Sequence, residues 1–328
     1  MASKPWHGSK WPKGVTHEIS GYEKPLYSIL DNAASKYPDA TYTIFADVGH
    51  TFRQVKDTAD RIANFLASHG IGKGDRVAIF LPNLPHFPEI FFGILKAGAT
   101  AVTCNPLYKS SELNYQLKDC GAKALFVMDH PVFYPTAAAA LEGTEAKTVV
   151  ICNVKSYLPK LKGMLGSLLG KIPKAERHEP GHFLFDDIVK ASKPQTPSLN
   201  INPKEDVALI IYSGGTTGTP KGACVSHANV LSNVLCVQEW VRVSEKPGAP
   251  VQQVAPGGVH TYLGVLPWYH SFGMTLAMLW SCHAASKLVC IPDPRAGNPP
   301  FTEVLKAVEK HKVTIMAAVP TIYSAFVN

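Results

Sequence analysis

One segment of ten residues, from Ser213 to Gly222, constrains this chain more than any other part of its sequence. The segment follows an apolar run, Val207 to Tyr212, that predicts a buried strand. Its glycines can turn backbone N–H groups toward an anion; they are Gly214, Gly215, Gly218 and Gly222. Its side chains add one ammonium group and four hydroxyl groups, which belong to Lys221, Ser213, Thr216, Thr217 and Thr219. This composition predicts a loop that binds polyphosphate.

The loop is not the P-loop of ordinary nucleotide triphosphatases. That motif requires G-x-x-x-x-G-K-[ST], whereas Lys221 follows Pro220 and precedes Gly222. The alternative interpretation is a surface turn rich in glycine and threonine, which is a common feature of proteins. Such turns rarely combine four glycines, four hydroxyl groups and a lysine directly after a buried strand, so we favour phosphate binding.

The segment from Tyr212 to Gly222, together with Cys224 to Asn229, resembles the phosphate loop of the adenylate-forming (AMP-binding) enzymes. This superfamily contains the acyl-CoA ligases, the luciferases and the adenylation domains of peptide synthetases. Many members have a serine at the position of Gly214, and the glycine resembles the form found in fatty acyl-CoA ligases. The resemblance is therefore closest to medium-chain and long-chain fatty acyl-CoA ligases.

The rest of the chain alternates apolar runs of strand length with helical patterns. The clearest helix runs from Thr51 to His69, because Thr51 and Gln54 form the pattern of a capping box and Gly70 follows the last turn. Strands are predicted over residues 77–81, 100–103, 124–127, 148–151, 207–212, 263–266, 288–291 and 314–317. Runs that are apolar on both faces predict largely parallel sheets covered by helices, so the expected fold class is α/β.

A chain of 328 residues, 46% of them hydrophobic, can form more than one packed unit. The resemblance implies the large adenylation domain of the family, with one sheet in about residues 70–222 and a second in about residues 20–69 and 227–328. Family members continue with a small barrel, a magnesium-binding glutamate and a C-terminal domain that carries the adenylation lysine. Residues 1–328 therefore resemble the N-terminal part only, and we expect this chain alone to be a poor catalyst or none.

The resemblance implies ATP-dependent activation of a fatty acid to an acyl adenylate, followed by transfer to coenzyme A. In this interpretation the loop residues named above bind ATP, and Lys221 is catalytic because it stabilises the departing pyrophosphate. Ser213 occupies a position where the family often has a magnesium-contacting threonine, so it is the candidate Mg²⁺ ligand. The alternatives are an aryl acid ligase of the coumarate type and a noncatalytic remnant of the fold.

A second block, Leu266 to Gly273, resembles the family segment that places a histidine and an aromatic residue beside the acyl pocket. The resemblance implies that His270, Phe272 and Gly273 belong to the substrate pocket and that His270 is a second catalytic residue. Without the resemblance, a single histidine is more often a hydrogen-bonded structural residue. We favour the pocket, because the position and the neighbours of the histidine match the family.

Charge and cysteine content limit the partners and the compartment. The net charge is +7, but no block of five or six basic residues is present, so we do not expect nucleic acid binding. The seven cysteines include no C-x-x-C pair and indicate reduced thiols. The sequence has neither a secretory signal pattern nor eighteen consecutive apolar residues, which favours a cytoplasmic protein.

Residues 155–174 interrupt the alternating pattern with leucines at helical spacing among lysines. A basic amphipathic helix of this kind can lie on an anionic membrane surface, so the segment is a candidate for peripheral membrane contact. The alternative, which we favour slightly, is an ordinary surface helix that packs its leucines against the protein.

Overall fold

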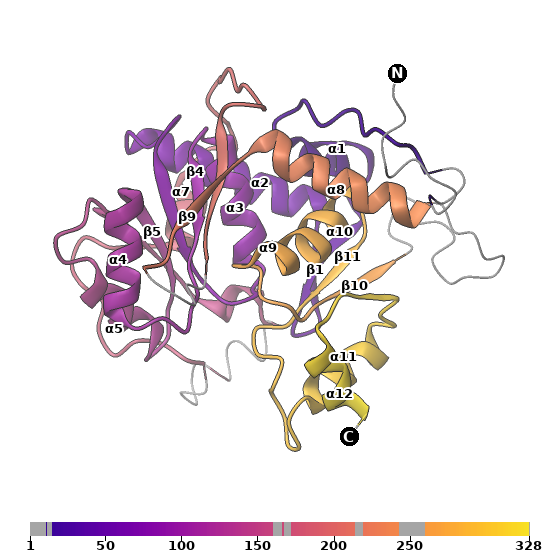
Figure 1. The fold of residues 1–328 in the computed structure, drawn as a ribbon. Helices are drawn as coiled ribbons and strands as arrows, with labels where there is room; N and C mark the ends of the chain where they lie inside the picture. Colours follow the sequence, from indigo (N-terminus) through magenta and orange to yellow (C-terminus); the bar gives the residue numbers. More distant parts are fainter. Residues whose placement is uncertain are drawn as a thin grey trace.

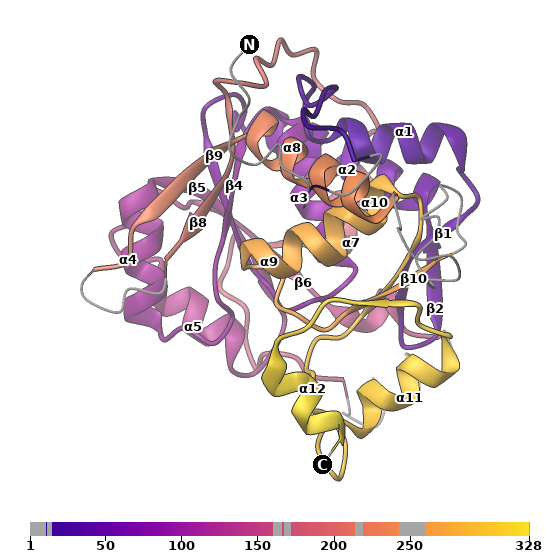
Figure 2. The same ribbon diagram turned by 45° about the vertical axis from the view of Figure 1, so that its right-hand side comes forward.

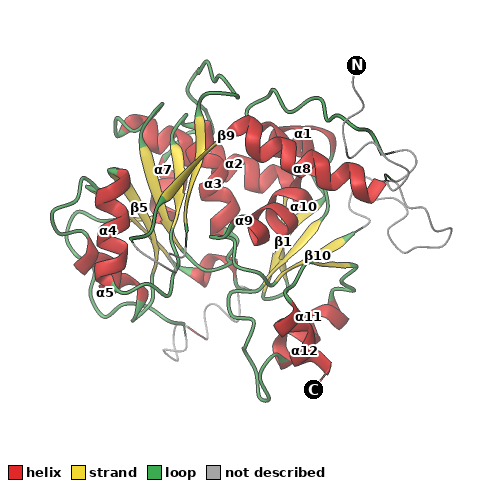
Figure 3. Ribbon diagram, viewed as in Figure 1, coloured by secondary structure: helices red, strands yellow, loops and turns green. Residues whose placement is uncertain are grey.

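The computed structural model describes residues 11, 15–159, 166, 172–213, 219–242 and 260–327. Two β-sheets stand side by side, and helices lie between them and around them (Figure 1 and Figure 2). Helices and strands alternate along most of the described chain (Figure 3). The predicted α/β class, with two largely parallel sheets flanked by helices, is therefore confirmed.

The larger sheet contains seven strands, β3 (Arg76–Phe80), β4 (Thr100–Thr103), β5 (Ala122–Met128), β6 (Thr148–Cys152), β7 (Phe183–Leu184), β8 (Val207–Tyr212) and β9 (Gly222–Ser226). They lie in the order β7-β6-β5-β3-β4-β8-β9. Neighbouring strands are parallel except for β8 and β9, which form an antiparallel hairpin at one edge. This hairpin carries the two ends of the predicted phosphate loop.

The smaller sheet contains five strands, β1 (Thr41–Phe45), β2 (Val48–Thr51), β10 (Thr261–Gly264), β11 (Lys287–Cys290) and β12 (Ile315–Met316). They lie in the order β12-β10-β11-β1-β2, and β1 and β2 are the antiparallel pair. The sequence patterns missed β1, β2, β7 and β9, because these strands are short or partly exposed and contain no long apolar run.

Two helices, α2 (Phe52–Ser68) and α3 (His86–Lys96), pack between the two sheets (Figure 1). Gly93 of α3 lets the two helices approach closely, since a Cβ atom at this position would lie 2.7 Å from the side chain of Ile62 in α2. The other longer helices are α1 (Ser28–Lys36), α4 (Ser110–Cys120), α5 (Phe133–Ala140), α7 (Phe185–Ala191), α8 (His227–Arg242), α11 (Thr302–Lys310) and α12 (Pro320–Val327).

The helix predicted from Thr51 to His69 is confirmed as α2. Oγ1 of Thr51 accepts a hydrogen bond of 3.2 Å from the backbone N–H of Gln54. Oε1 of Gln54 in turn accepts one of 2.8 Å from the backbone N–H of Thr51, so the predicted capping box is complete. The helix begins where the sequence places its cap, because the two bonds satisfy backbone N–H groups that would otherwise have no partner.

The structure describes only part of the leucine-rich segment 155–174. Residues 160–165 and 167–171 lie outside the described residues, so the expected amphipathic helix stays a prediction. The described start of the segment belongs to a 3₁₀ turn, η1 (Val154–Tyr157). None of the helices that the structure describes is long and apolar enough to span a bilayer.

Candidate functional site

The two ends of the predicted phosphate loop meet at the open end of the β8–β9 hairpin. Tyr212 pairs with Gly222 in the hairpin register. Just beyond this pair, the backbone N–H of Ser213 donates a hydrogen bond of 3.1 Å to the carbonyl oxygen of Lys221. The backbone N–H of Lys221 donates a longer one, of 3.4 Å, to Oγ of Ser213. Ser213 and Lys221 therefore close the neck of the loop.

The polar side chains at the neck of the loop are exposed to solvent. The side chains of Thr219 and Lys221 are exposed, and the ammonium group of Lys221 forms no ion pair with any described carboxylate. This charge is therefore available to an anion. Five other residues expected to bind ATP lie outside the described residues; they are Gly214, Gly215, Thr216, Thr217 and Gly218.

Two tyrosines hold the base of the hairpin against α4. The hydroxyl group of Tyr115 donates a hydrogen bond of 3.0 Å to the carbonyl oxygen of Pro220. The hydroxyl group of Tyr212 donates one of 2.5 Å to Oδ2 of Asp119, and burial together with this bond raises the pKa of Tyr212. A Cβ atom at Gly222 would lie 3.1 Å from the ring of Tyr212, so glycine suits this position. The neck of the loop thus rests on a fixed support.

The loop that follows β10 carries the second predicted block, and the side chain of Asn83 fixes its backbone. Asn83 lies just after β3 of the larger sheet and is buried. Its Nδ2 donates hydrogen bonds to the carbonyl oxygens of Gly264 (2.9 Å) and Leu266 (2.8 Å). Its Oδ1 accepts a bond of 2.9 Å from the backbone N–H of Trp268. The side-chain amide of Asn83 therefore links the larger sheet to the loop that follows β10 and leads to His270.

His270 precedes a short helix, α9 (Ser271–Gly273), which continues into the π-helical turn η2 (Met274–Leu279). The imidazole ring of His270 lies 4.5 Å from the ring of Tyr269, and partial burial lowers the pKa of His270. Gly273 is buried, and a Cβ atom there would lie 2.4 Å from the carbonyl oxygen of Pro267. The chain can turn from the loop into α9 only because this residue has no side chain.

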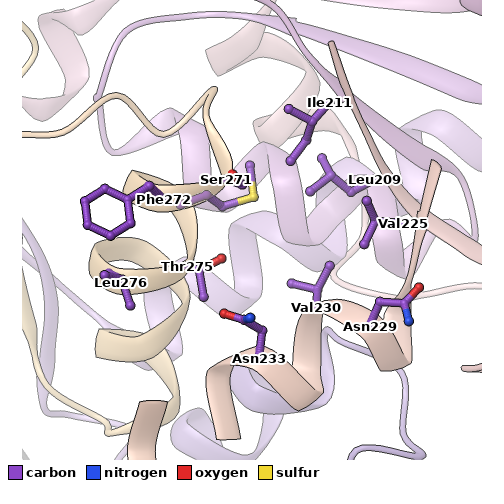
Figure 4. Close-up of a pocket in the computed structure, with 11 residues that line it drawn as sticks. Leu209, Ile211, Val225, Asn229, Val230, Asn233, Ser271, Phe272, Thr275 and Leu276 are labelled. Atoms are coloured by element: carbon purple, nitrogen blue, oxygen red, sulfur yellow. The ribbon is translucent and has the colours of Figure 1, made fainter. Parts of the chain in front are cut away.

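A cavity of about 420 Å³ lies between the β8–β9 hairpin, α8 and the α9–η2 segment (Figure 4). Phe272 lines it on one side, and Ile211 and Val225 of the hairpin line it on the other (Figure 4). Gly273 and His270 are not among the described residues that line the cavity, although Ser271, Phe272 and Met274 beside them are. The other lining residues are Leu209, Asn229, Val230, Asn233, Ser271, Met274, Thr275 and Leu276.

The sequence patterns did not indicate the part of this cavity that α8 and η2 form. Asn229 and Asn233 are four residues apart, so they share one face of α8, and both line the cavity (Figure 4). Thr275 belongs to η2, and π-helical turns occur frequently at functional sites. The spacing of the two asparagines was a signal in the sequence that could have identified this face of the helix.

The described residues do not form a metal site on their own. No three histidine, cysteine, aspartate or glutamate side chains in the described part of the chain come together around a common point. Ser213, the candidate Mg²⁺ ligand, contributes a single hydroxyl group at the neck of the loop. Mg²⁺ in nucleotide enzymes is bound largely by water and by substrate phosphates. Ser213 therefore fits a magnesium ion that binds together with a nucleotide.

The sequence and the fold agree with a known family. A sequence model described as "AMP-binding enzyme" matches residues 30–328. The chain belongs to this family. It is 32% identical to a long-chain-fatty-acid–CoA ligase of Bacillus subtilis, over 98% of this chain and 55% of that protein. It is 31% identical to a ligase of the same description from Salmonella typhimurium, again over 98% and 55% of the two chains.

Solved structures of this family have the same fold. A long-chain-fatty-acid-CoA ligase from Archaeoglobus fulgidus superposes with a TM-score of 0.73 at 24% identity, over 97% of this chain and 56% of that one. An anthranilate CoA ligase in complex with anthranoyl-AMP also gives 0.73, at 23% identity, over 93% and 52%. The chain therefore spans about half the length of the relatives and structures that it matches.

Proposed function

We propose that this chain carries the acid-activating site of an ATP-dependent acyl-CoA ligase that acts on a fatty acid. One observation carries the proposal: the neck of the phosphate loop and an apolar cavity share the β8–β9 hairpin. Ile211 and Val225 line the cavity, and Ser213 and Lys221 close the loop at the open end of the same two strands. A fatty acid in the cavity would thus hold its carboxylate close to a nucleotide held by the loop.

The chemistry requires this proximity. A carboxylate does not react with a thiol in water, because oxide is a very poor leaving group. A bond from the carboxylate oxygen to the α-phosphorus of ATP expels pyrophosphate, and the thiol of coenzyme A then attacks the acyl carbon and expels AMP. Negative charge develops on the departing pyrophosphate, where the ammonium group of Lys221 and the backbone N–H groups of the loop would stabilise it.

The remaining predicted residues have supporting roles in this proposal. The hydroxyl group of Ser213 would complete the coordination of a magnesium ion whose other ligands are phosphate oxygens and water. Phe272 would contact the acyl chain, and His270 would lie at the edge of the pocket, where its partly buried, neutral imidazole can accept a hydrogen bond. Thr219 and the five loop residues outside the described residues would complete the ATP site.

We also propose the two subdomains that the sequence predicts, at about residues 70–222 and at about residues 20–69 with 227–328. Strands β3 to β9 lie within or just beyond the first range, and the other strands lie within the second, which supports this division.

A peripheral membrane contact through residues 155–174, in a cytoplasmic protein, remains part of the proposal and is supported by the leucine and lysine pattern alone. Co-sedimentation of the protein with anionic vesicles tests this membrane contact.

The decisive experiment is ATP–pyrophosphate exchange with palmitate, measured on the complete product of the gene, whether or not it extends past Asn328. Loss of one well-placed donor to a developing anion costs about 3 kcal/mol, so Lys221→Ala should lower the exchange rate roughly a hundredfold. The matched control is Lys306→Ala, which removes an exposed lysine paired with Glu303. Equal rates in Lys221→Ala and the wild type would contradict the assigned role.

The same experiment distinguishes the two alternatives. Exchange with 4-coumarate but not with palmitate would identify an aryl acid ligase. Absence of both exchange and ATP binding in calorimetry would identify a noncatalytic remnant of the fold. Exchange with palmitate that depends on Lys221 supports the fatty acid ligase.

A further inference from the structure

A second cavity, also of about 420 Å³, lies far from the phosphate-loop hairpin. Its walls come from β2, α2, the first turn of α3, η1 and α7. The turn η1 follows β6, and three strands, β5, β3 and β4, separate β6 from the β8–β9 hairpin in the larger sheet. Whatever occupies this cavity is therefore not the acid or the nucleotide of the proposed reaction.

A buried carboxyl group forms part of the cavity wall. Glu89 lines the cavity, although only 2% of its surface is exposed. Its Oε2 accepts a hydrogen bond from the hydroxyl group of Tyr157, and no described donor bonds to Oε1. Burial raises the pKa of Glu89 to about 8, and the nearby carboxylate of Asp186 acts in the same direction. Glu89 is therefore protonated at neutral pH and lacks a cationic partner.

Aromatic rings pack around Tyr157, the hydrogen-bond partner of this carboxyl group. The ring of Tyr157 lies 4.9 Å from that of His50 and 4.3 Å from that of His86, and Phe185 packs 4.8 Å from His86. Nδ1 of His50, which also lines the cavity, has no hydrogen-bond partner among the described residues. Burial lowers the pKa of both histidines, for His86 to about 3, so both rings are neutral.

The charged groups of the cavity leave an excess of carboxyl groups. Arg53 and Asp57 both line the cavity. Arg53 pairs with Asp39 at 3.2 Å and Asp57 pairs with Arg61 at 2.7 Å, and neither Asp39 nor Arg61 lines it. Asp186 also lines the cavity. It accepts a hydrogen bond from the hydroxyl group of Ser156, and no described cation pairs with it. Glu89 and Asp186 are thus two neighbouring acids, and neither forms an ion pair with a cation among the described residues.

We propose that this cavity binds a small organic cation, a primary ammonium group on a short apolar stem. An ammonium group has three hydrogen-bond donors, and the cavity offers it the carboxyl oxygens of two lining residues, Glu89 and Asp186. The aromatic side chains of Tyr157 and Phe185 also line the cavity and would add favourable contacts for a cation and its stem. At about 30 Å³ for a group the size of water, a cavity of about 420 Å³ has room for a ligand of up to about fourteen non-hydrogen atoms.

Binding of such a cation displaces a proton and changes no covalent bond of the ligand. The ammonium group keeps its own three hydrogens. The carboxyl group of Glu89 releases its proton to solvent, because the positive charge at short range favours the ionised form. At pH 7 the complex should therefore release close to one proton for each cation bound, and this release is specific to a site built on Glu89.

The test is calorimetric titration of the full chain with propylammonium chloride at pH 7, in two buffers that differ in ionisation enthalpy. We expect saturable binding at one site with proton release, and much weaker binding of tetramethylammonium, which has no N–H donor. Glu89→Gln keeps the volume of the side chain and an acceptor for Tyr157, and should weaken binding at least tenfold and abolish the proton release. The matched control, Glu303→Gln, removes an exposed carboxylate of α11 that does not line the cavity and should bind as the wild type does.

Two results would overturn the proposal. The first is absence of saturable propylammonium binding to the wild type. The second is equal affinity and equal proton release in Glu89→Gln. If circular dichroism shows that Glu89→Gln does not fold, the exposed rim residue Asp186 decides the question, since Asp186→Asn leaves the core untouched. Weaker binding in Asp186→Asn supports the site, and unchanged binding contradicts it.

Discussion

Asn83 accepts a hydrogen bond of 2.9 Å from the backbone N–H of Trp268, although the two residues follow strands of different sheets. The same side chain donates to the carbonyl oxygens of Gly264 and Leu266. These bonds are buried, so water cannot replace them. The position of the loop that leads to His270 therefore depends on a residue of the larger sheet.

Replacement of this side chain should lower stability substantially. Asn83→Ala leaves one backbone N–H and two carbonyl oxygens buried without a partner, which should reduce the free energy of unfolding by about 3 kcal/mol. Urea unfolding followed by circular dichroism measures this change. Asn233→Ala is the matched control, because the exposed amide of Asn233 makes no hydrogen bond with a described residue. A loss below 1 kcal/mol in Asn83→Ala would show that the loop is held by other contacts.

A methyl group at Gly273 should disturb the turn that forms the cavity wall. In Gly273→Ala the added Cβ atom would lie 2.4 Å from the carbonyl oxygen of Pro267, and backbone atoms cannot move aside as a flexible side chain can. Overpacking of this kind costs about 2 kcal/mol of unfolding free energy.

Gly72→Ala provides the comparison for that measurement. Its added Cβ atom would meet the carbonyl oxygen of Ala97 at an ordinary distance of 3.6 Å. We expect its unfolding midpoint in urea to lie near that of the wild type, while that of Gly273→Ala falls. Equal midpoints for the two variants would contradict the role assigned to Gly273.

The buried carboxyl group of Glu89 should make stability depend on pH in a defined window. Its pKa is about 8 in the folded chain and about 4.3 in an unfolded chain. Between these values the folded state holds a proton that the unfolded state has released, so stability falls as pH rises, by at most about 1.4 kcal/mol per pH unit. His86 has a pKa of about 3 in the folded chain and of about 6.5 in an unfolded chain. Its titration therefore makes stability rise with pH between these values, and this effect fades above pH 6.5.

Between pH 6.5 and 8, comparison of the wild type with Glu89→Gln therefore isolates Glu89. Unfolding free energies from urea titrations should fall across this range in the wild type, and Glu89→Gln should remove up to about 2 kcal/mol of that fall. Because all other titrating groups are common to both proteins, the difference between the two curves reports on Glu89. Parallel curves would show that its carboxyl group is already ionised at pH 6.5.

Features that depend on neighbours in the sequence could be predicted from the sequence. The cap of α2 needs only Thr51 and Gln54, three residues apart, and both hydrogen bonds form as predicted. The strand before the phosphate loop needs only a run of apolar residues, and β8 has the predicted bounds, Val207–Tyr212. Membership of the AMP-binding family was likewise predicted from short motifs and is confirmed by the match over residues 30–328.

Features that depend on distant neighbours required the tertiary structure. The main cavity joins β8, α8 and η2, and no pattern within one of these elements indicates that the others face it. The carboxyl group of Glu89 lies against Tyr157, which is 68 residues away, and its raised pKa results from burial that only packing produces. Local hydrogen bonding and apolar spacing act within a few residues, so they determine elements and motifs. Solvent exclusion acts between elements, so the cavities and the protonation of buried groups were decided by the folded chain alone.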